Sequence, residues 1–300
     1  MTNQDERPVT EWPTLVMIAA TYSVWAVSTT IVAGFWLPLA ILITAFAIAQ
    51  FSSLQHECLH GHPFRNKYVN AALVFPALTL IVPYLRFRDT HLDHHNDSRL
   101  TDPYDDPETN FLDPGKWEHL PRAAKILLEI NNSLAGRIFL GPIIGTAVFF
   151  RNDLKTWRTD ARVRRGWLFH IPALVPIILW LTYVGSMPFW AYALAAYFGL
   201  GLLRIRTFLE HQAHERSNAR TVIIDDCGPL SLLFLNNNYH AVHHAHPAIP
   251  WYRLRRTYRS DTDKFLRAND GYYFTCYGAI FRQYLLRRKD PVAHPLWRRS

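Results

Sequence analysis

The chain has 300 residues, 49% of them hydrophobic, with a formal net charge of +8. A mean hydropathy of −0.05 is ordinary for a soluble protein, but this average hides a strong segregation of charged and apolar residues. The positive charge does not indicate nucleic-acid binding, because the basic residues flank apolar blocks or crowd the C-terminal part, where they suit anionic lipid headgroups or an acidic partner protein. The three cysteines (Cys58, Cys227 and Cys276) form no Cys-x-x-Cys pair and predict no disulfide framework.

Two long blocks, residues 12–55 and 166–203, contain no Asp, Glu, Lys or Arg. A spanning helix needs about 20 mostly apolar residues, so each block is about two spans long. Each has a turn signal near its centre, at residues 34–38 and 185–188. We therefore predict an all-α integral membrane protein with four transmembrane helices in two hairpins, at about 13–33, 36–55, 167–184 and 188–208. Two buried hairpins of a soluble protein are disfavoured by the length of the charge-free runs.

The distribution of charge predicts the orientation. Both hairpin turns lack charge, whereas Lys and Arg crowd the other ends of the blocks, as at Arg65, Arg86 and Arg204. The positive-inside tendency places those ends and both termini in the cytoplasm. The first apolar stretch has an acidic-rich start and no small-residue cleavage site, which argues against a cleavable signal peptide. We expect a single domain over residues 1–300 and a multi-pass protein of a bacterial inner membrane.

The remaining segments predict a cytoplasmic helical cap. Residues 69–85 are apolar but short and interrupted by Pro76 and Pro83, which favours a re-entrant or interfacial helix. Residues 97–114 are typical of a loop. Residues 123–150 suit an amphipathic helix on the membrane, with a fifth span as the alternative. The tail from Trp251 onward suits an interfacial cap or a solvated basic tail.

Over half of the fifteen histidines fall into three short boxes. The boxes contain His56 and His60; His91, His94 and His95; and His240, His243 and His244. The spacings i, i+4 and i, i+3, i+4 place these side chains on one face of a helix. A single such pair is often a chance pattern of core histidines, but three boxes together indicate metal binding, since imidazole is a common metal ligand. Two, three and three ligands are too many for one ion and suit two.

The predicted topology brings the boxes together. The first follows the second span directly, the second follows the short apolar segment, and the third follows the fourth span by about thirty residues, all on the cytoplasmic side. A ninth ligand is expected at the end of the fourth span, where His211 is preferred over His214. Further candidates, as ligands or as partners that orient ligands, are Glu210, Glu57, Asp93 and Asn237; solvated or loop-capping roles are the alternative. No ligand role is assigned to His62, His119, His170, His246 and His294.

The type and number of the candidate ligands narrow the choice of metal. A structural zinc site uses four ligands, often including Cys, and a mononuclear iron oxygenase uses two histidines and one carboxylate. Eight or nine imidazoles fit a dinuclear centre instead, with iron as the expected occupant.

This pattern resembles the membrane fatty acid desaturase and hydroxylase superfamily. That superfamily carries HxxxH or HxxxxH, then HxxHH, then HxxHH or QxxHH, on the cytoplasmic side of four membrane helices, and all three boxes match here. Residues 208–211 (Phe-Leu-Glu-His) resemble the extra-histidine motif of plant-type acyl-lipid desaturases and alkane hydroxylases. The resemblance covers most of the chain, and its motifs are specific for the superfamily rather than for its branches.

The resemblance implies two non-haem iron ions that use O2 and two supplied electrons to remove hydrogen from an unactivated C–H bond. It implies a desaturase that introduces a double bond into a fatty acyl chain of a lipid or acyl thioester. The alternatives are a lipid or alkyl hydroxylase, or a carotenoid ketolase or hydroxylase; the ketolases also have a glycine after the first box, as at Gly61. A non-enzymatic metal-binding membrane protein is a remote alternative, whose ligands should line the spans. Because the chain has no HPGG haem-binding signature, a separate donor such as ferredoxin or cytochrome b5 with its reductase is expected.

Overall fold

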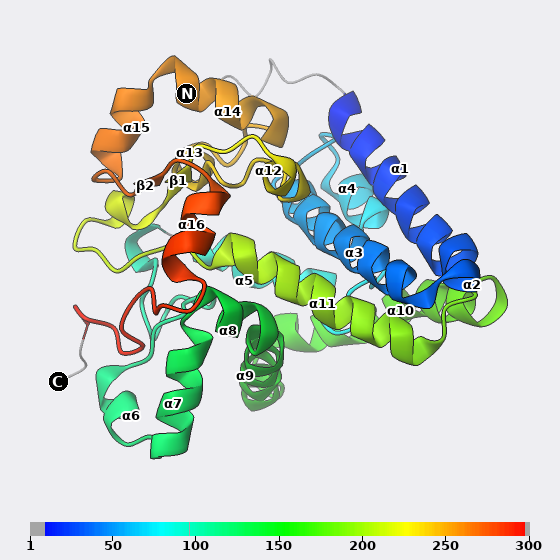
Figure 1. Ribbon diagram of the computed structural model, residues 1–300, viewed down its shortest axis with the longest axis horizontal. Helices are drawn as coiled ribbons and strands as arrows, with labels where there is room; N and C mark the ends of the chain where they lie inside the picture. Colours follow the sequence, from blue (N-terminus) through cyan, green and yellow to red (C-terminus); the bar gives the residue numbers. More distant parts are fainter. Residues whose placement is uncertain (1–9, 96, 298–300) are drawn as a thin grey trace.

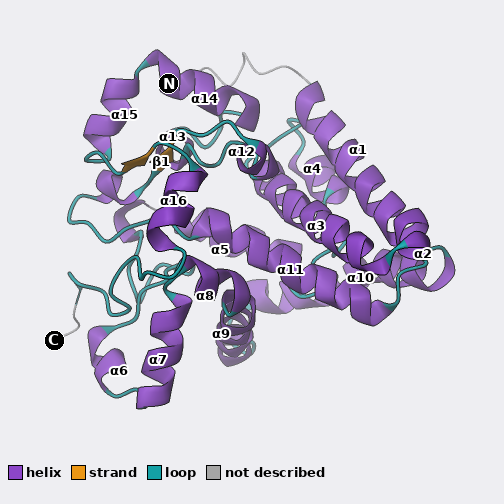
Figure 2. Cartoon of the chain, viewed as in Figure 1, coloured by secondary structure: helices purple, strands orange, loops and turns teal. Residues whose placement is uncertain are grey.

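The computed structural model describes residues 10–95 and 97–297. The described chain is mostly helical, and its elements form two regions (Figures 1 and 2). Long helices from the first two thirds of the chain form a bundle, and short helices with one small sheet form a cap at one end of it.

The bundle contains the apolar blocks. Its long helices are α1 (Trp12–Val27), which continues through a π-helical turn (Ser28–Val32) into α2 (Ala33–Phe35), α3 (Leu37–Leu59), α10 (Ala161–Tyr183) and α11 (Phe189–Thr207). The first predicted turn lies where expected. Trp36 is extended between α2 and α3, and Pro38 occupies the first turn of α3, where a missing N–H costs nothing.

Among the described residues, three helices are long and apolar enough to cross a membrane: Trp12–Phe35, Leu37–Leu59 and Ala161–Tyr183. The third, α10, starts earlier than the predicted residue 167, because about a turn and a half with three arginines (residues 161–165) precedes the apolar block in the same helix. The fourth predicted span corresponds to α11, which has 19 residues but carries Arg204 and Arg206 in its last turn. The fourth span therefore stays a prediction.

The packing departs from two separate hairpins. α1 packs against α3, as a hairpin requires. However, α11 packs mainly on α3, and α10 packs on α5 (Tyr84–His94). The turn between α10 and α11 is tied to the first hairpin, since the N–H groups of Ser186 and Met187 donate to the carbonyl of Thr29 at 2.9 and 3.1 Å. The second pair is thus joined by a short turn without being a closely packed hairpin.

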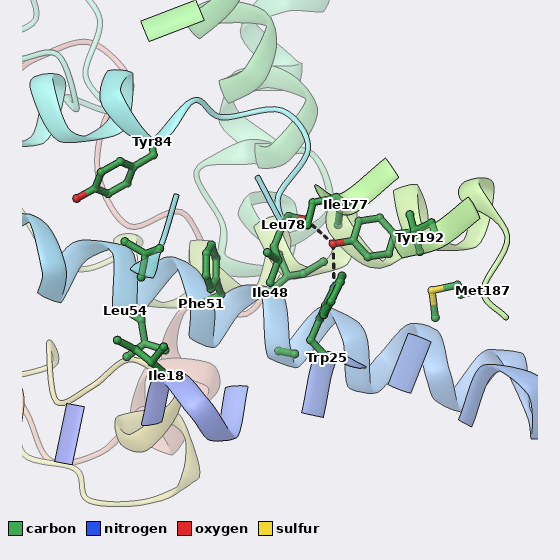
Figure 3. Packing of buried hydrophobic residues seen from close by; sticks show 14 of the residues in the cluster. Ile18, Trp25, Ile48, Phe51, Leu54, Leu78, Tyr84, Ile177, Met187 and Tyr192 are labelled. Atoms are coloured by element: carbon green, nitrogen blue, oxygen red, sulfur yellow. Dashed lines mark hydrogen bonds between the residues drawn. The ribbon is translucent and has the colours of Figure 1, made fainter. Parts of the chain in front are cut away.

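A buried aromatic network holds the bundle together (Figure 3). The indole N–H of Trp25 donates to the Tyr192 hydroxyl at 3.0 Å, and this hydroxyl donates to the carbonyl of Leu78 at 3.0 Å. Leu78 belongs to the short apolar segment, in which the helix α4 (Lys67–Leu73) ends well before Pro76. The rest of that segment is irregular, and Tyr192 satisfies one of its buried carbonyl groups, as burial requires.

Apart from α9, the cap consists of short elements. Residues 123–150, predicted as one amphipathic helix, lie in three: α7 (Arg122–Asn131), α8 (Leu134–Phe139) and α9 (Gly141–Thr156). The chain breaks at Ser133, whose hydroxyl accepts from the N–H of Gly136 and caps α8. The other cap elements are α6 (Pro114–Glu118), β1 (Ile223–Ile224), α12 (Pro229–Leu233), α13 (His240–Ala245), α14 (Trp251–Ser260), α15 (Thr262–Ala268), β2 (Tyr273–Phe274) and α16 (Tyr277–Tyr284). The strands pair in parallel, Ile223 opposite Tyr273.

Candidate metal centre

The first two boxes lie at the ends of helices. His56 lies in the last turn of α3, and His60 is the residue that caps it. His91 and His94 lie in the last turn of α5, and His95 caps that helix. Both helices end at the same boundary between bundle and cap, so their i, i+4 faces meet there.

The third box forms a short helix of its own. α13 begins at His240 and also carries His243 and His244. His211 follows the end of α11, and an isolated bridge to Thr221 fixes its backbone. The third box and His211 therefore reach the boundary from the cap side.

The nine histidines come together as two groups. The five-histidine cluster contains His56, His60, His91, His95 and His243, and the four-histidine cluster contains His94, His211, His240 and His244. Within each cluster, one ligand nitrogen per residue lies within 4.8 Å of all the others. Each cluster draws on more than one box, so neither could form from a single helix.

The ring nitrogens converge closely. In the five-histidine cluster, Nε2 of His95 lies 3.0 Å from Nε2 of His91 and 3.2 Å from Nε2 of His243. In the four-histidine cluster, Nε2 of His211 lies 2.9 Å from Nε2 of His94 and 3.1 Å from Nε2 of His240. Imidazoles whose Nε2 atoms face each other at these distances are expected where both atoms bind the same cation.

Unsatisfied nitrogens support the same interpretation. Nε2 of His56 and Nε2 of His60 are buried and have no hydrogen-bond partner among the described residues. Buried polar atoms are normally paired, so each such atom needs an explanation such as an ion. Burial, and then the neighbouring imidazoles, lower the pKa of His60, His95 and His211. These rings are neutral near pH 7, which is the form that binds metals. The residues therefore fit two metal ions with nitrogen ligands.

Two carboxylates that the sequence did not single out contact the second box. Nδ1 of His94 lies 2.8 Å from Asp106, and Nδ1 of His91 lies 3.2 Å from Glu108. Both come from the predicted loop over residues 97–114. A carboxylate on the second ring nitrogen fixes the tautomer and directs Nε2 toward the metal.

These carboxylates also set the local charge. Burial opposes a proton on His94, but Glu108 and Asp106 outweigh it and raise the pKa of His94 to about 9. Burial alone would raise the pKa of Glu108, whereas His91 and His94 lower it to about 2. The negative charge that favours a proton on His94 also favours a metal cation at the same place.

Two of the further candidates, Glu210 and Asn237, lie beside the four-histidine cluster. The amide of Asn237 donates to Glu210 at 2.8 Å, and its oxygen lies 3.3 Å from Nδ1 of His240. Glu210 forms a buried ion pair with Arg206 at 3.0 Å. Its carboxylate is 3.7 Å from Nδ1 of His240, so it contacts the side of the ring that faces away from the other imidazoles.

Three other candidates lie outside both clusters. Asp93 is half exposed and pairs with Arg162 at 3.1 Å, because it projects from the side of α5 that faces α10. His214 lies 3.2 Å from Asp270 on the surface, so His211 rather than His214 joins the cluster. Glu57 accepts the N–H of Trp251 at 2.9 Å and belongs to a different group.

That group involves a histidine outside the three boxes, for which no ligand role is predicted. His62 is fully buried, and its Nδ1 lies 2.8 Å from Glu11, while its Nε2 lies 3.9 Å from Glu57. The three side chains tie the start of α1 to the turn after the first box. His119, His170, His246 and His294 lie outside both histidine clusters.

Known proteins resemble this chain over most of its length. The family model described as "Fatty acid desaturase" matches residues 33–276, which include all nine clustered histidines. A "Fatty acid desaturase" from Bacillus subtilis (strain 168) is 23% identical over 248 residues, covering 71% of this chain. The match spans 64% of that relative's length, slightly less than two thirds. The resemblance to the membrane desaturase and hydroxylase superfamily is therefore confirmed, and the chain belongs to the fatty acid desaturase family.

Proposed function

We propose that this protein is an O2-dependent diiron desaturase that introduces a double bond into a fatty acyl chain. The observation that carries the proposal is the sorting of nine imidazoles into a five-histidine and a four-histidine cluster at the end of long apolar helices. Two iron ions bound there would supply the oxidising power, drawn from O2, to break unactivated C–H bonds.

The ligands would be the nine clustered histidines, whose role is to hold the metal rather than to act as general bases. Asp106, Glu108, Asn237 and Glu210 would orient His94, His91 and His240 through their Nδ1 atoms. All of these groups except Glu108 are buried, which would keep bulk water away from the reacting carbon.

The membrane arrangement supports an acyl substrate. Helices α1 to α3, α10 and α11 would form four spans, with both termini and the metal centre on the cytoplasmic side of a bacterial inner membrane, in agreement with the uncharged turns at the far end. The chain would form one domain, because cap and bundle share the metal clusters. An acyl chain from the bilayer would approach the centre along the apolar helices. The electrons would come from a separate carrier.

The test is expression in a host of known lipid composition, followed by mass spectrometry of the lipids. Loss of two hydrogens alone supports the desaturase. Gain of one oxygen indicates a hydroxylase of the same superfamily, and gain of one oxygen with loss of two hydrogens indicates a ketolase. The variant His94→Ala should abolish the change. An active His94→Ala protein, or a wild-type protein that leaves every lipid unchanged with bound iron and a working donor, would overturn the proposal.

A further inference from the structure

We propose that the exposed arginine face of α14 is the docking surface for an acidic one-electron carrier protein. The arginine face consists of Arg253, Arg255, Arg256 and Arg259. This inference rests on the proposed function, because only a redox reaction gives such a carrier a purpose.

The face carries concentrated and largely uncompensated positive charge. α14 has four exposed arginines in ten residues and no acidic residue. Arg259 pairs with Asp225 at 2.8 Å, whereas Arg253 and Arg256 form no ion pair with any residue that the structure describes. Such a patch attracts acidic proteins over distances of about 10 Å at moderate salt.

The surroundings favour a protein partner over a lipid surface. The apolar side of α14 is already covered, since Leu254 and Tyr258 are buried and the Tyr258 ring packs on Phe265 of α15. Across residues 233–284, all described, no large apolar side chain is exposed. An interfacial helix needs an apolar face to bury in lipid, and α14 offers none. By contrast, α7 exposes Ile126 and Ile130.

The position of α14 suits electron delivery to both metal positions. In Figure 1, α14 lies beside α13 in the cap, at the top of the view and away from α2. At its start, the N–H of Trp251 donates to Glu57, which directly follows His56 of the five-histidine cluster. Farther along, the Tyr258 ring lies 5.3 Å from that of Tyr239, which directly precedes His240 of the four-histidine cluster. The helix that carries the arginine face therefore contacts a residue next to a histidine of each cluster.

The stoichiometry requires such a partner. Forming a double bond removes two hydrogen atoms from the acyl chain, and reducing O2 to two waters consumes them together with two further electrons and two protons. A one-electron carrier must therefore be oxidised twice in each turnover. Two encounters per cycle require fast and reversible association, which electrostatic attraction between exposed charges provides.

The experiment compares two double variants of the full-length protein in nanodiscs. Arg253→Glu with Arg256→Glu reverses charge on the arginine face. The control, Arg151→Glu with Arg158→Glu, makes the same change at exposed positions in α9 and just after it, away from α14. Product formation is driven either by a reduced acidic [2Fe–2S] ferredoxin, with an acidic cytochrome b5 haem domain as second probe, or by dithionite, and carrier binding is measured separately.

We expect the α14 variant to raise the KM for the carrier about tenfold or more, with dithionite-driven turnover unchanged and the control near wild type. Added salt should weaken carrier-driven turnover of the wild type and not of the α14 variant. Equal effects of both variants would overturn the proposal. So would no effect of either, or an effect confined to nanodiscs with anionic lipid, which would assign the face to lipid headgroups. If the α14 variant forms product with the same KM for the carrier as the wild type, the docking surface alone is refuted. If the carrier binds at α14 in a salt-dependent way but the wild type forms no product, the proposed function alone is refuted.

Discussion

Replacing Asp106 by Asn should weaken one of the two metal positions and leave the other intact. One oxygen of Asp106 accepts from Nδ1 of His94 at 2.8 Å and from the N–H of Glu108 at 2.9 Å, and the other accepts from the N–H of Thr101 at 2.8 Å. An asparagine side chain has one acceptor oxygen and no charge. It therefore cannot hold both His94 and the loop as the carboxylate does.

The expected loss of metal affinity follows from the lost negative charge of Asp106. A hydrogen bond to a charged group contributes about 1.5–3 kcal/mol, and each 1.4 kcal/mol corresponds to about tenfold in affinity. The affinity at the four-histidine cluster, which contains His94, should fall about 10- to 100-fold, in line with other carboxylate partners of metal-bound histidines. The matched control is Asp93→Asn, one residue before His94, where the carboxylate is half exposed and pairs with Arg162. It should change affinity by less than about twofold.

The assay is titration of the metal-free, full-length protein in detergent with Fe²⁺ against a competing chelator, which resolves the two binding steps. Circular dichroism and thermal unfolding show whether each variant remains folded. The reasoning is refuted if Asp106→Asn binds metal like Asp93→Asn, or if both binding steps weaken equally.

Three further outcomes are expected. His211→Ala should lose one of two bound irons while His214→Ala keeps both, as measured by iron analysis of the purified protein; the reverse result would mean that the four-histidine cluster is misassigned. Gly199→Ala should lower the thermal unfolding midpoint in detergent, because the added methyl group would lie 2.9 Å from a backbone carbonyl oxygen of α3. Such overpacking lowers the free energy of unfolding by about 1–3 kcal/mol. An unchanged or higher midpoint contradicts the close packing of α11 on α3. Tyr192→Phe should lower the free energy of unfolding by about 1–3 kcal/mol, because the carbonyl of Leu78 in the irregular segment loses its hydrogen-bond donor. The control is Tyr183→Phe, at an exposed position. Equal unfolding midpoints for the two variants would argue against the buried network.

The clustering of the histidines was predictable because its signal is local. Histidines at i, i+3 and i+4 share a helix face wherever the helix lies, and the charge-free blocks with basic ends placed all three boxes on one side. The sequence also led us to prefer His211 over His214. Only the structure shows where each ring lies. By contrast, the partners Asp106 and Glu108 lie 12 and 17 residues from the histidines they contact, in a loop without periodicity. Asp93 was the nearer candidate in sequence, yet its place on α5 directs it to α10 instead.

The sequence by itself determined the family, the helical class, three of the four predicted spans as helices long enough to cross a membrane, and the set of histidines that converge, because hydropathy and helix spacing act over a few turns of chain. Only the tertiary structure showed that the histidines form one cluster of five and one of four, and which carboxylates contact them. It also showed that α11 packs mainly on α3 and that His62 lies buried between Glu11 and Glu57. These features depend on contacts between segments far apart in the chain. Their geometry is set by packing and by the need to satisfy buried polar groups, neither of which leaves a periodic pattern in the sequence.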